Sequence, residues 1–186
     1  MQIFKKISIL SLSLIMLAAC KDDNVPKIDT AKVNQERILG GWGIDGTKAY
    51  VNVSTALKPH LAPFNLDGKL QNKLDEKASG ASFYFKKETV YFLRYGVVRD
   101  SSKYTLDEYK IYLDNPELIG FYAPSFYIKF SDGLFITYLR KEETLELLEK
   151  DSGISNLDMN LIRKAVEDAQ CELRFRREYL PIYDEL

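Results

Sequence analysis

The hydrophobic pattern of the chain changes its period at Gly80. Before this point Leu66, Leu70 and Leu74 recur every fourth residue, which predicts an amphipathic helix over Asn65–Lys77. After it, apolar and polar residues alternate, and aromatic and β-branched residues are frequent. Such alternation is typical of strands that bury one face. The pattern therefore predicts a helical segment followed by a run of strands.

The alternating segments are short and separated by turn residues, so they predict consecutive strands. They are Trp42–Ile44 with a continuation over Ala49–Val53, then Ser82–Lys86, Thr89–Tyr95, Val97–Arg99, Lys103–Leu106, Tyr109–Leu113, Ser125–Phe130, Leu134–Arg140 and Cys171–Tyr179. Asp132-Gly133 gives the strongest hairpin signal, because both central residues of a type I′ turn take positive φ.

Three more helices are predicted outside the alternating segments. They are Val33–Leu39, Glu142–Lys150 and Leu157–Val166, the last with Ser155 and Asp158 as a capping box. About eight strands in meander order, with helices inserted after the first and before the last, favour a mainly β fold closed as an antiparallel barrel. A half-open sheet capped by the helices is the alternative.

The N-terminal residues have the composition of a bacterial secretory signal, with Lys5 and Lys6 ahead of an apolar run. This run is too short to span a bilayer, which needs about 20 apolar residues. Leu17-Ala18-Ala19-Cys20 then matches the lipobox of bacterial lipoproteins, whose signal is cut before an acylated cysteine. We expect a signal peptide over 1–19, a lipidated Cys20 with a flexible tether over 20–32, and a single domain over 33–186.

Loss of the signal leaves 24 basic and 27 acidic residues, a net charge of −3. This charge gives no reason to expect nucleic acid as a partner. With Cys20 acylated, Cys171 has no partner for an intramolecular disulfide. Alternation turns Cys171 inward with Leu173 and Phe175, which predicts a small buried hydrophobe rather than a reactive thiol.

Candidate catalytic and metal-binding residues are sparse. His60 is the single histidine, and without a Gly-x-Ser-x-Gly elbow it gives little support to a serine triad. One histidine and two cysteines are too few for a zinc site built on these residues. Residues 41–46 match Gly-x-Gly-x-x-Gly, but Trp42 fills the turn and no βαβ unit follows. The sequence therefore predicts a non-enzymatic protein without cofactor or metal.

Aromatic residues are in excess, with 12 Tyr, 10 Phe and 1 Trp. In Phe83-Tyr84-Phe85, alternation places phenylalanine on one face of a strand and tyrosine on the other. Inward phenylalanines would fill the barrel, which we favour, whereas inward tyrosines would line a cavity for a small amphipathic ligand. The candidate lining residues are Tyr84, Tyr91, Tyr95 and Tyr127.

The lipobox, the Gly-Gly-Trp sequence at a helix-to-strand junction, the inserted helices and the meander resemble the lipocalin-like lipoproteins of Bacteroides-type bacteria. The similarity covers residues 38–150. It implies an eight-stranded barrel with Trp42 at its base. It also implies that Lys21, Asp22 and Asp23 form a signal that exports the anchored protein to the outer membrane and its cell-surface side.

Two functions are consistent with these expectations for a lipid-anchored envelope protein. The first is binding of a small hydrophobic or amphipathic ligand inside the barrel. The alternative is a structural or interaction lipoprotein with a filled barrel, which contacts a protein or glycan partner through its surface. An interior cavity of about 300 Å³ or more favours the first. The apolar segment Leu118–Pro124 is expected either to form a contact patch or to pack against the helices.

Overall fold

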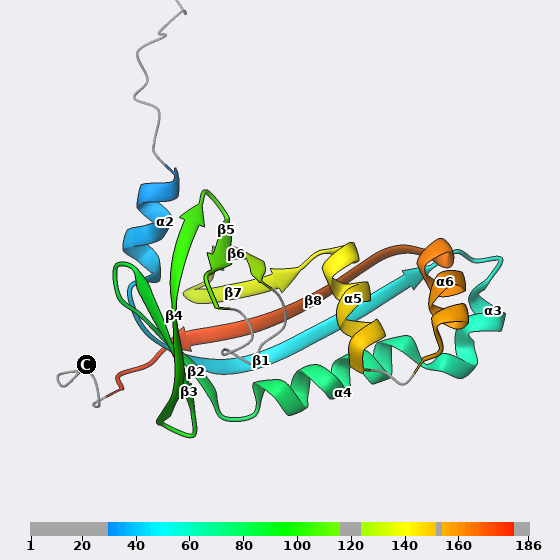
Figure 1. The fold of residues 1–186 in the computed structure, drawn as a ribbon, viewed down its shortest axis with the longest axis horizontal. Coiled ribbons are helices and arrows are strands. Elements are labelled where there is room, and N and C mark those ends of the chain that lie inside the picture. Colours follow the sequence, from blue (N-terminus) through cyan, green and yellow to red (C-terminus); the bar gives the residue numbers. More distant parts are fainter. Residues whose placement is uncertain (1–29, 116–123, 152–153, 181–186) are drawn as a thin grey trace, which may run out of the picture.

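The computed structural model describes residues 30–115, 124–151 and 154–180 (Figure 1). Its helices are α2 (Thr30–Ile38), α3 (Lys58–Leu61), the 3-10 helix η1 (Ala62–Phe64), α4 (Leu66–Ala78), α5 (Lys141–Asp151) and α6 (Asn156–Ala165). Its strands are β1 (Gly40–Val53), β2 (Ala81–Phe85), β3 (Thr89–Arg94), β4 (Val97–Asp107), β5 (Lys110–Leu113), β6 (Ser125–Ser131), β7 (Leu134–Leu139) and β8 (Val166–Arg177). None of the helices in these ranges combines the length and apolarity needed to cross a membrane.

The strands form a closed antiparallel barrel in sequence order, with β1 pairing both β2 and β8. The predicted lipocalin-like barrel with inserted helices is confirmed, and the half-open sheet is wrong. Closure leaves few free sheet edges, which aromatic strands would otherwise expose to aggregation. The predicted hairpin turn is also confirmed, because Asp132 and Gly133 both have positive φ, of 52° and 77°.

The barrel extends on one side into an arm formed by β1, β8 and the helices α3 to α6. Strand β1 pairs with β2 only up to Gly43 but continues beside β8 as far as Val53. Figure 1 shows this long pair of strands leaving the barrel, with α4 along it and α5 and α6 across it. The arm therefore gives the inserted helices a surface to pack against.

Helix α4 covers the edge of β1 that β2 leaves open. The backbone N–H of Ala49 donates to Gln71 Oε1 (2.9 Å), and that of Val51 donates to Asp67 Oδ1 (2.5 Å). On the neighbouring face of the helix, the leucines of the predicted apolar stripe are buried. One helix thus satisfies edge donors with polar side chains and adds apolar side chains to the core.

In β4 and β8, pairing carries the strand through polar residues that lie outside the predicted bounds. The segments predicted as separate strands at Val97–Arg99 and Lys103–Leu106 form the single strand β4, in which Asp100–Ser102 pairs with Val90–Phe92. Strand β8 begins at Val166 rather than Cys171, because Asp168–Gln170 pairs with Tyr50–Asn52 of β1. Cross-strand pairing outweighs local preference at both places.

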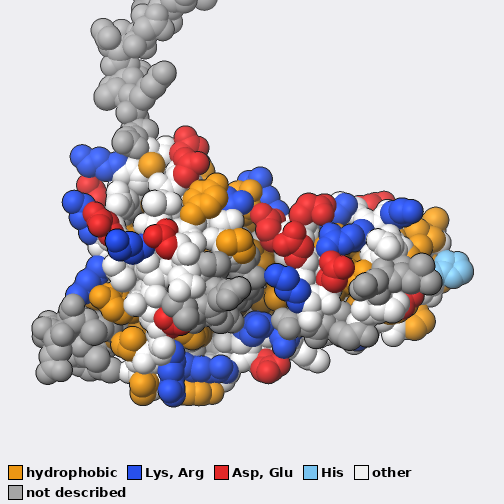
Figure 2. Space-filling view, in the orientation of Figure 1, with side chains coloured by type: hydrophobic (Ala, Val, Ile, Leu, Met, Phe, Trp, Pro, Cys, Tyr) orange, Lys and Arg blue, Asp and Glu red, His pale blue; other side chains and the backbone are white. Residues whose placement is uncertain are grey.

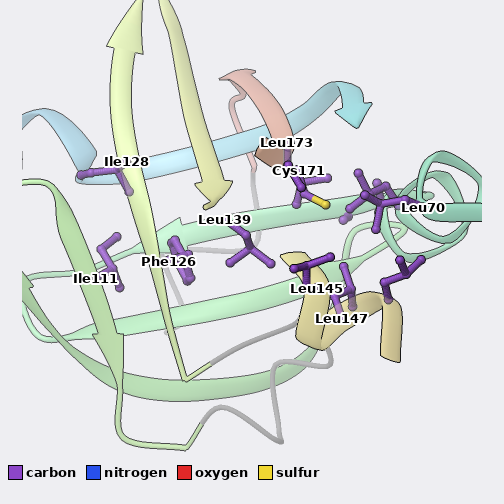
Figure 3. Packing of buried hydrophobic residues seen from close by; sticks show 14 of the residues in the cluster. Leu70, Ile111, Phe126, Ile128, Leu139, Leu145, Leu147, Cys171 and Leu173 are labelled. Atoms are coloured by element: carbon purple, nitrogen blue, oxygen red, sulfur yellow. The ribbon is translucent and has the colours of Figure 1, made fainter. Parts of the chain in front are cut away.

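A continuous hydrophobic core joins the barrel to the arm. Figure 3 shows Ile111, Phe126 and Ile128 inside the barrel, followed by Leu139, Cys171 and Leu173 and then by Leu70 and Leu145 from the helices. All of these side chains are buried. The predicted inward orientation of Cys171 with Leu173 and Phe175 is confirmed.

Candidate binding surface

The interior of the barrel is filled with aromatic rings. The Phe135 ring lies 5.2 Å from Trp42, 5.7 Å from Phe85 and 5.8 Å from Phe175, measured between centroids. These separations are those of rings in direct contact. Phe83 and Phe126 are also fully buried in the same cluster. The side chains that point inward therefore pack on one another.

The four tyrosines that were candidates for lining an interior cavity lie elsewhere. Tyr84, Tyr91 and Tyr127 are half-buried and alternate with buried residues, so they occupy the outer faces of β2, β3 and β6. Tyr95 lies in the turn between β3 and β4, with a positive φ of 53° and 70% of its side chain exposed. The interior lining is mainly phenylalanine, because that ring buries without a hydroxyl group to satisfy. Tyr104 is also buried in this cluster, and its hydroxyl donates to the backbone oxygen of Lys86 (2.9 Å).

On the outside of the barrel, tyrosines form cross-strand pairs. Tyr127 of β6 is opposite Tyr138 of β7, and their rings stack with centroids 5.4 Å apart. Tyr84 and Tyr91 form a looser pair across β2 and β3, with centroids 6.5 Å apart. Aromatic cross-strand pairs of this kind stabilise a sheet.

Cationic side chains lie over the rings of the Tyr127–Tyr138 pair. The Arg140 guanidinium is 4.0 Å and the Lys110 ammonium 4.6 Å from the Tyr127 centroid. Lys129 lies 5.2 Å from the centroid of Tyr138. Cations at these distances are attracted by the electron-rich ring face. The faces of both rings are therefore covered by other side chains of the protein.

Glu172 joins these cations from the neighbouring strand β8. Its carboxylate accepts from Lys129 Nζ (2.7 Å), Arg174 Nη2 (3.0 Å) and Gln170 Nε2 (2.8 Å). Burial alone would raise the pKa of Glu172, but the hydrogen bonds from Lys129 and Arg174 outweigh it and hold that pKa below its usual range. Glu172 is thus ionised and holds two cations in place.

The strand register places these residues in one row across five strands. Lys110 is opposite Tyr127, which is opposite Tyr138, then Glu172, then Lys48 of β1. Lys110 also lies 3.5 Å from Glu143. We call the surface built on this row the tyrosine–cation face, and its residues are Lys48, Lys110, Tyr112, Tyr127, Lys129, Tyr138, Arg140, Glu172 and Arg174.

Trp42 lies where helix α2 meets the barrel. Its indole N–H donates to the backbone oxygen of Ile38 (2.7 Å), and the Arg177 guanidinium covers its ring at 4.1 Å. The glycines on either side of Trp42 are needed for close packing. A Cβ on Gly41 would lie 2.5 Å from the backbone oxygen of Glu178, and one on Gly43 would lie 2.1 Å from the Glu178 carboxylate. Two glycines of the Gly-x-Gly-x-x-Gly match therefore pack against the chain just after β8, whereas a Cβ on the third, Gly46, would meet nothing within 4 Å.

The remaining candidates for chemistry are inert or isolated. Burial raises the pKa of the Cys171 thiol to about 12, which keeps it protonated at neutral pH. His60 is exposed on α3, and Figure 2 shows the histidine at the tip of the arm. No cluster of three potential metal ligands occurs among the described residues. Cys20, Lys21, Asp22 and Asp23 lie outside the described residues, as does most of Leu118–Pro124.

Three pockets lie away from the aromatic interior. One of about 240 Å³ lies in the arm between Val53 and Leu66, below the roughly 300 Å³ of most ligand sites. One of about 400 Å³ lies between Gln35 and Tyr104, and one of about 470 Å³ between Gly43 and Gly96. The two larger ones are open and partly polar, so they are clefts rather than ligand cavities.

The sequence interpretation named Tyr127 only as a candidate for the barrel interior, and it missed the other members of the surface on which Tyr127 lies. Tyr138, Lys110, Lys129 and Arg140 carry no motif, and they meet only through the register of strands β5, β6 and β7. The available signal was alternation, which places Tyr127 and Lys129 on one face of β6.

Comparison with known proteins gives no relative from which a function can be transferred. No protein-family model, no curated protein and no solved structure matches the chain.

Proposed function

We propose that this protein is a lipid-anchored, non-enzymatic envelope lipoprotein that contacts a protein or glycan partner through the outer surface of a filled, lipocalin-like barrel. The observation that supports it is the sorting of aromatic residues. Phenylalanines fill most of the interior, with Tyr104 among them, whereas Tyr127 and Tyr138 form the tyrosine–cation face together with cations. A filled interior leaves the surface as the place where recognition occurs.

The competing proposal is a small hydrophobic or amphipathic ligand held inside the barrel. Such a ligand would need room where Phe135 now contacts four other rings. It would also find few polar groups to fix its orientation, since Tyr84, Tyr91 and Tyr127 lie on the outer faces. The hydroxyl of the buried Tyr104 already donates to the backbone oxygen of Lys86. Ligand pockets combine an apolar lining with a few placed polar groups.

Native mass spectrometry of the full chain, purified mildly as the lipid-free Cys20→Ala variant, tests this choice. We expect the mass of the protein alone. A small molecule that co-purifies reproducibly at one per chain would overturn the proposal in favour of an interior ligand. A Phe135→Trp variant serves as the control, because a larger interior ring would expel such a molecule and leave a surface-bound one.

The lipid anchor is tested by fractionating cells that carry Cys20→Ala. The variant should leave the membrane fraction, since the apolar run before Cys20 is too short to span a bilayer. A Cys171→Ala variant is the matched control and should stay with the membrane. Retention of the Cys20→Ala protein in membranes would contradict lipid anchoring.

The side of the outer membrane is tested by replacing Lys21, Asp22 and Asp23 with alanine. If these residues direct export, protease added to intact cells should cleave the variant less than the unaltered protein, while both remain in the membrane fraction. Equal cleavage of the two proteins would remove the export role and leave the anchor unaffected.

A further inference from the structure

We propose that the tyrosine–cation face binds a linear anionic glycan that carries carboxylate or sulfate groups. This inference rests on the proposed function, because it names the partner of the same surface. Three features of the face support it, which are its charge, its unpaired cations and the positions of its rings.

The face is positively charged on a chain with a net charge of −1. Its cations are Lys48, Lys110, Lys129, Arg140 and Arg174. Two carboxylates pair with them, Glu143 with Lys110 and Glu172 with Lys129 and Arg174. Asp107 is opposite Lys110 on the same face, so five positive charges meet three negative ones, and the remaining excess attracts anions. Asp107, opposite Lys110, and Asp168, bonded to Tyr50, bound the face at its two ends.

Two of the cations are available to a partner. Lys48 and Arg140 are exposed, and neither forms an ion pair within the described part of the chain. Arg140 is held over Tyr127, so its position is fixed although its charge is not neutralised. A guanidinium placed in this way offers its donors to a carboxylate or sulfate in a paired geometry.

The covered rings favour a glycan over a single-stranded nucleic acid. Binding of single strands relies on open aromatic faces on which bases stack. Here the face of Tyr127 is taken by Tyr138 and Arg140, and that of Tyr138 by Tyr127 and Lys129. The surface instead offers ammonium, guanidinium and phenol donors, which match the hydroxyl and carboxylate acceptors of an acidic sugar chain.

The shape of the face favours a flexible chain over a peptide strand or a bilayer. A peptide strand needs an open sheet edge, but β4 pairs with β5 at one end of the row and helix α4 covers the edge of β1 at the other. Five strands spaced about 4.8 Å apart give the row a length of roughly 19 Å. Because the row follows the curved wall of a barrel, a flat lipid surface would reach only part of it, whereas a linear polymer can follow it.

The test is a binding titration of the full-length Cys20→Ala chain with oligogalacturonate, a linear uronic acid oligomer. A neutral dextran oligomer of similar length, a single-stranded oligonucleotide and vesicles with anionic headgroups are tested in parallel. We expect saturable binding of the uronate that weakens with added salt, and no binding of dextran. Tighter binding of the oligonucleotide or the vesicles than of the uronate would overturn the inference.

Matched double variants separate the face from overall charge. Lys48→Gln with Arg140→Gln removes two positive charges from the face, whereas Lys103→Gln with Arg99→Gln removes two exposed ones from β4. We expect the first to weaken uronate binding by about tenfold or more and the second by less than about twofold. Equal losses would overturn the inference. Thermal unfolding checks that both variants fold as the parent does.

The result also separates this inference from the proposed function. If native mass spectrometry shows a protein free of small molecules but the uronate does not bind, the anionic glycan is excluded and a surface function stands. If an interior molecule is found, the proposed function fails regardless of what the face binds.

Discussion

The two faces of the same barrel strands hold aromatic residues in different ways. On the inner face, Phe135 and Phe126 are fully buried among other hydrophobic side chains. On the outer face, Tyr127 and Tyr138 stack on each other beneath cations and keep part of each ring in solvent. One hydroxyl group per ring distinguishes the two sets, and burying that group requires a hydrogen-bond partner, such as the Lys86 backbone oxygen that accepts from the buried Tyr104.

This difference links the inner face to the stability of the fold and the outer face to recognition of a partner. The inner rings gain free energy from burial and contact, so changes there should act on folding. The outer rings position cations, and the charged groups at their periphery remain exposed. Changes on the outer face should therefore act on partner binding more than on folding.

The largest expected effect comes from emptying the inner face. Phe135→Ala should lower the free energy of unfolding by about 3–5 kcal/mol, because it opens a cavity among rings that cannot collapse fully. Tyr127→Ala, its outer-face counterpart, should lower the free energy of unfolding by only about 1 kcal/mol, because it removes ring and cation contacts. Urea denaturation measures both values. Similar losses for the two variants would remove the distinction between the faces.

A smaller effect of opposite sign is expected at the one inner-face hydroxyl without a partner in the described structure. Thr137 is buried, and its Oγ1 has no hydrogen bond. Thr137→Val should raise the free energy of unfolding by about 1 kcal/mol, because valine keeps the shape and removes the unsatisfied group.

Thr144 provides the matched control for this substitution. It is equally buried, but its hydroxyl donates to the backbone oxygen of Leu139 (3.3 Å). Thr144→Val should therefore lower the free energy of unfolding by about 1 kcal/mol in the same urea experiment. Destabilisation by both substitutions would show that Thr137 is satisfied in solution and that the inner face tolerates polar groups.

The smallest effect is expected at Glu172 on the outer face. Glu172→Gln should lower the free energy of unfolding by about 0.5–1 kcal/mol at pH 7, since its cationic partners are well exposed. The pKa of Glu172 is lower in the folded protein than in the unfolded chain. The stabilising contribution is therefore fully present above the unfolded value of about 4.3 and is lost as pH falls through the folded value.

Chemical denaturation at pH 7 and at pH 3 measures this dependence. The difference in the free energy of unfolding between the unaltered protein and Glu172→Gln should be smaller at pH 3 than at pH 7. Glu36→Gln, an exposed substitution on α2, is the control and should differ little from the parent at either pH. If the difference in the free energy of unfolding between the parent and Glu172→Gln grows on acidification, the inference that Glu172 is ionised and paired is contradicted.

Local sequence patterns predicted much of this fold. Leu66, Leu70 and Leu74 specified the buried side of α4, and Asp132-Gly133 specified a hairpin turn. Both patterns act within a few residues, so no distant contact was needed to interpret them. Cys171 was placed inward by alternation for the same reason.

The inward face and the candidate site were harder to predict, because they depend on distant partners. Alternation in Phe83-Tyr84-Phe85 separates two faces but does not say which one is buried. The row through Lys110, Tyr138 and Glu172 depends on the register of strands that are far apart in sequence. A shift of one residue in any strand would have dispersed it.

The most direct test of the sorting of aromatic residues is a pair of hydroxyl exchanges followed by chemical denaturation. Phe135→Tyr adds a hydroxyl inside the barrel, and Tyr138→Phe removes one outside it. The account predicts that Phe135→Tyr lowers the free energy of unfolding by about 1–3 kcal/mol, whereas Tyr138→Phe changes it by less than about 0.5 kcal/mol. If Phe135→Tyr is instead as stable as the parent, the barrel contains room or water for a hydroxyl, and a filled interior is contradicted.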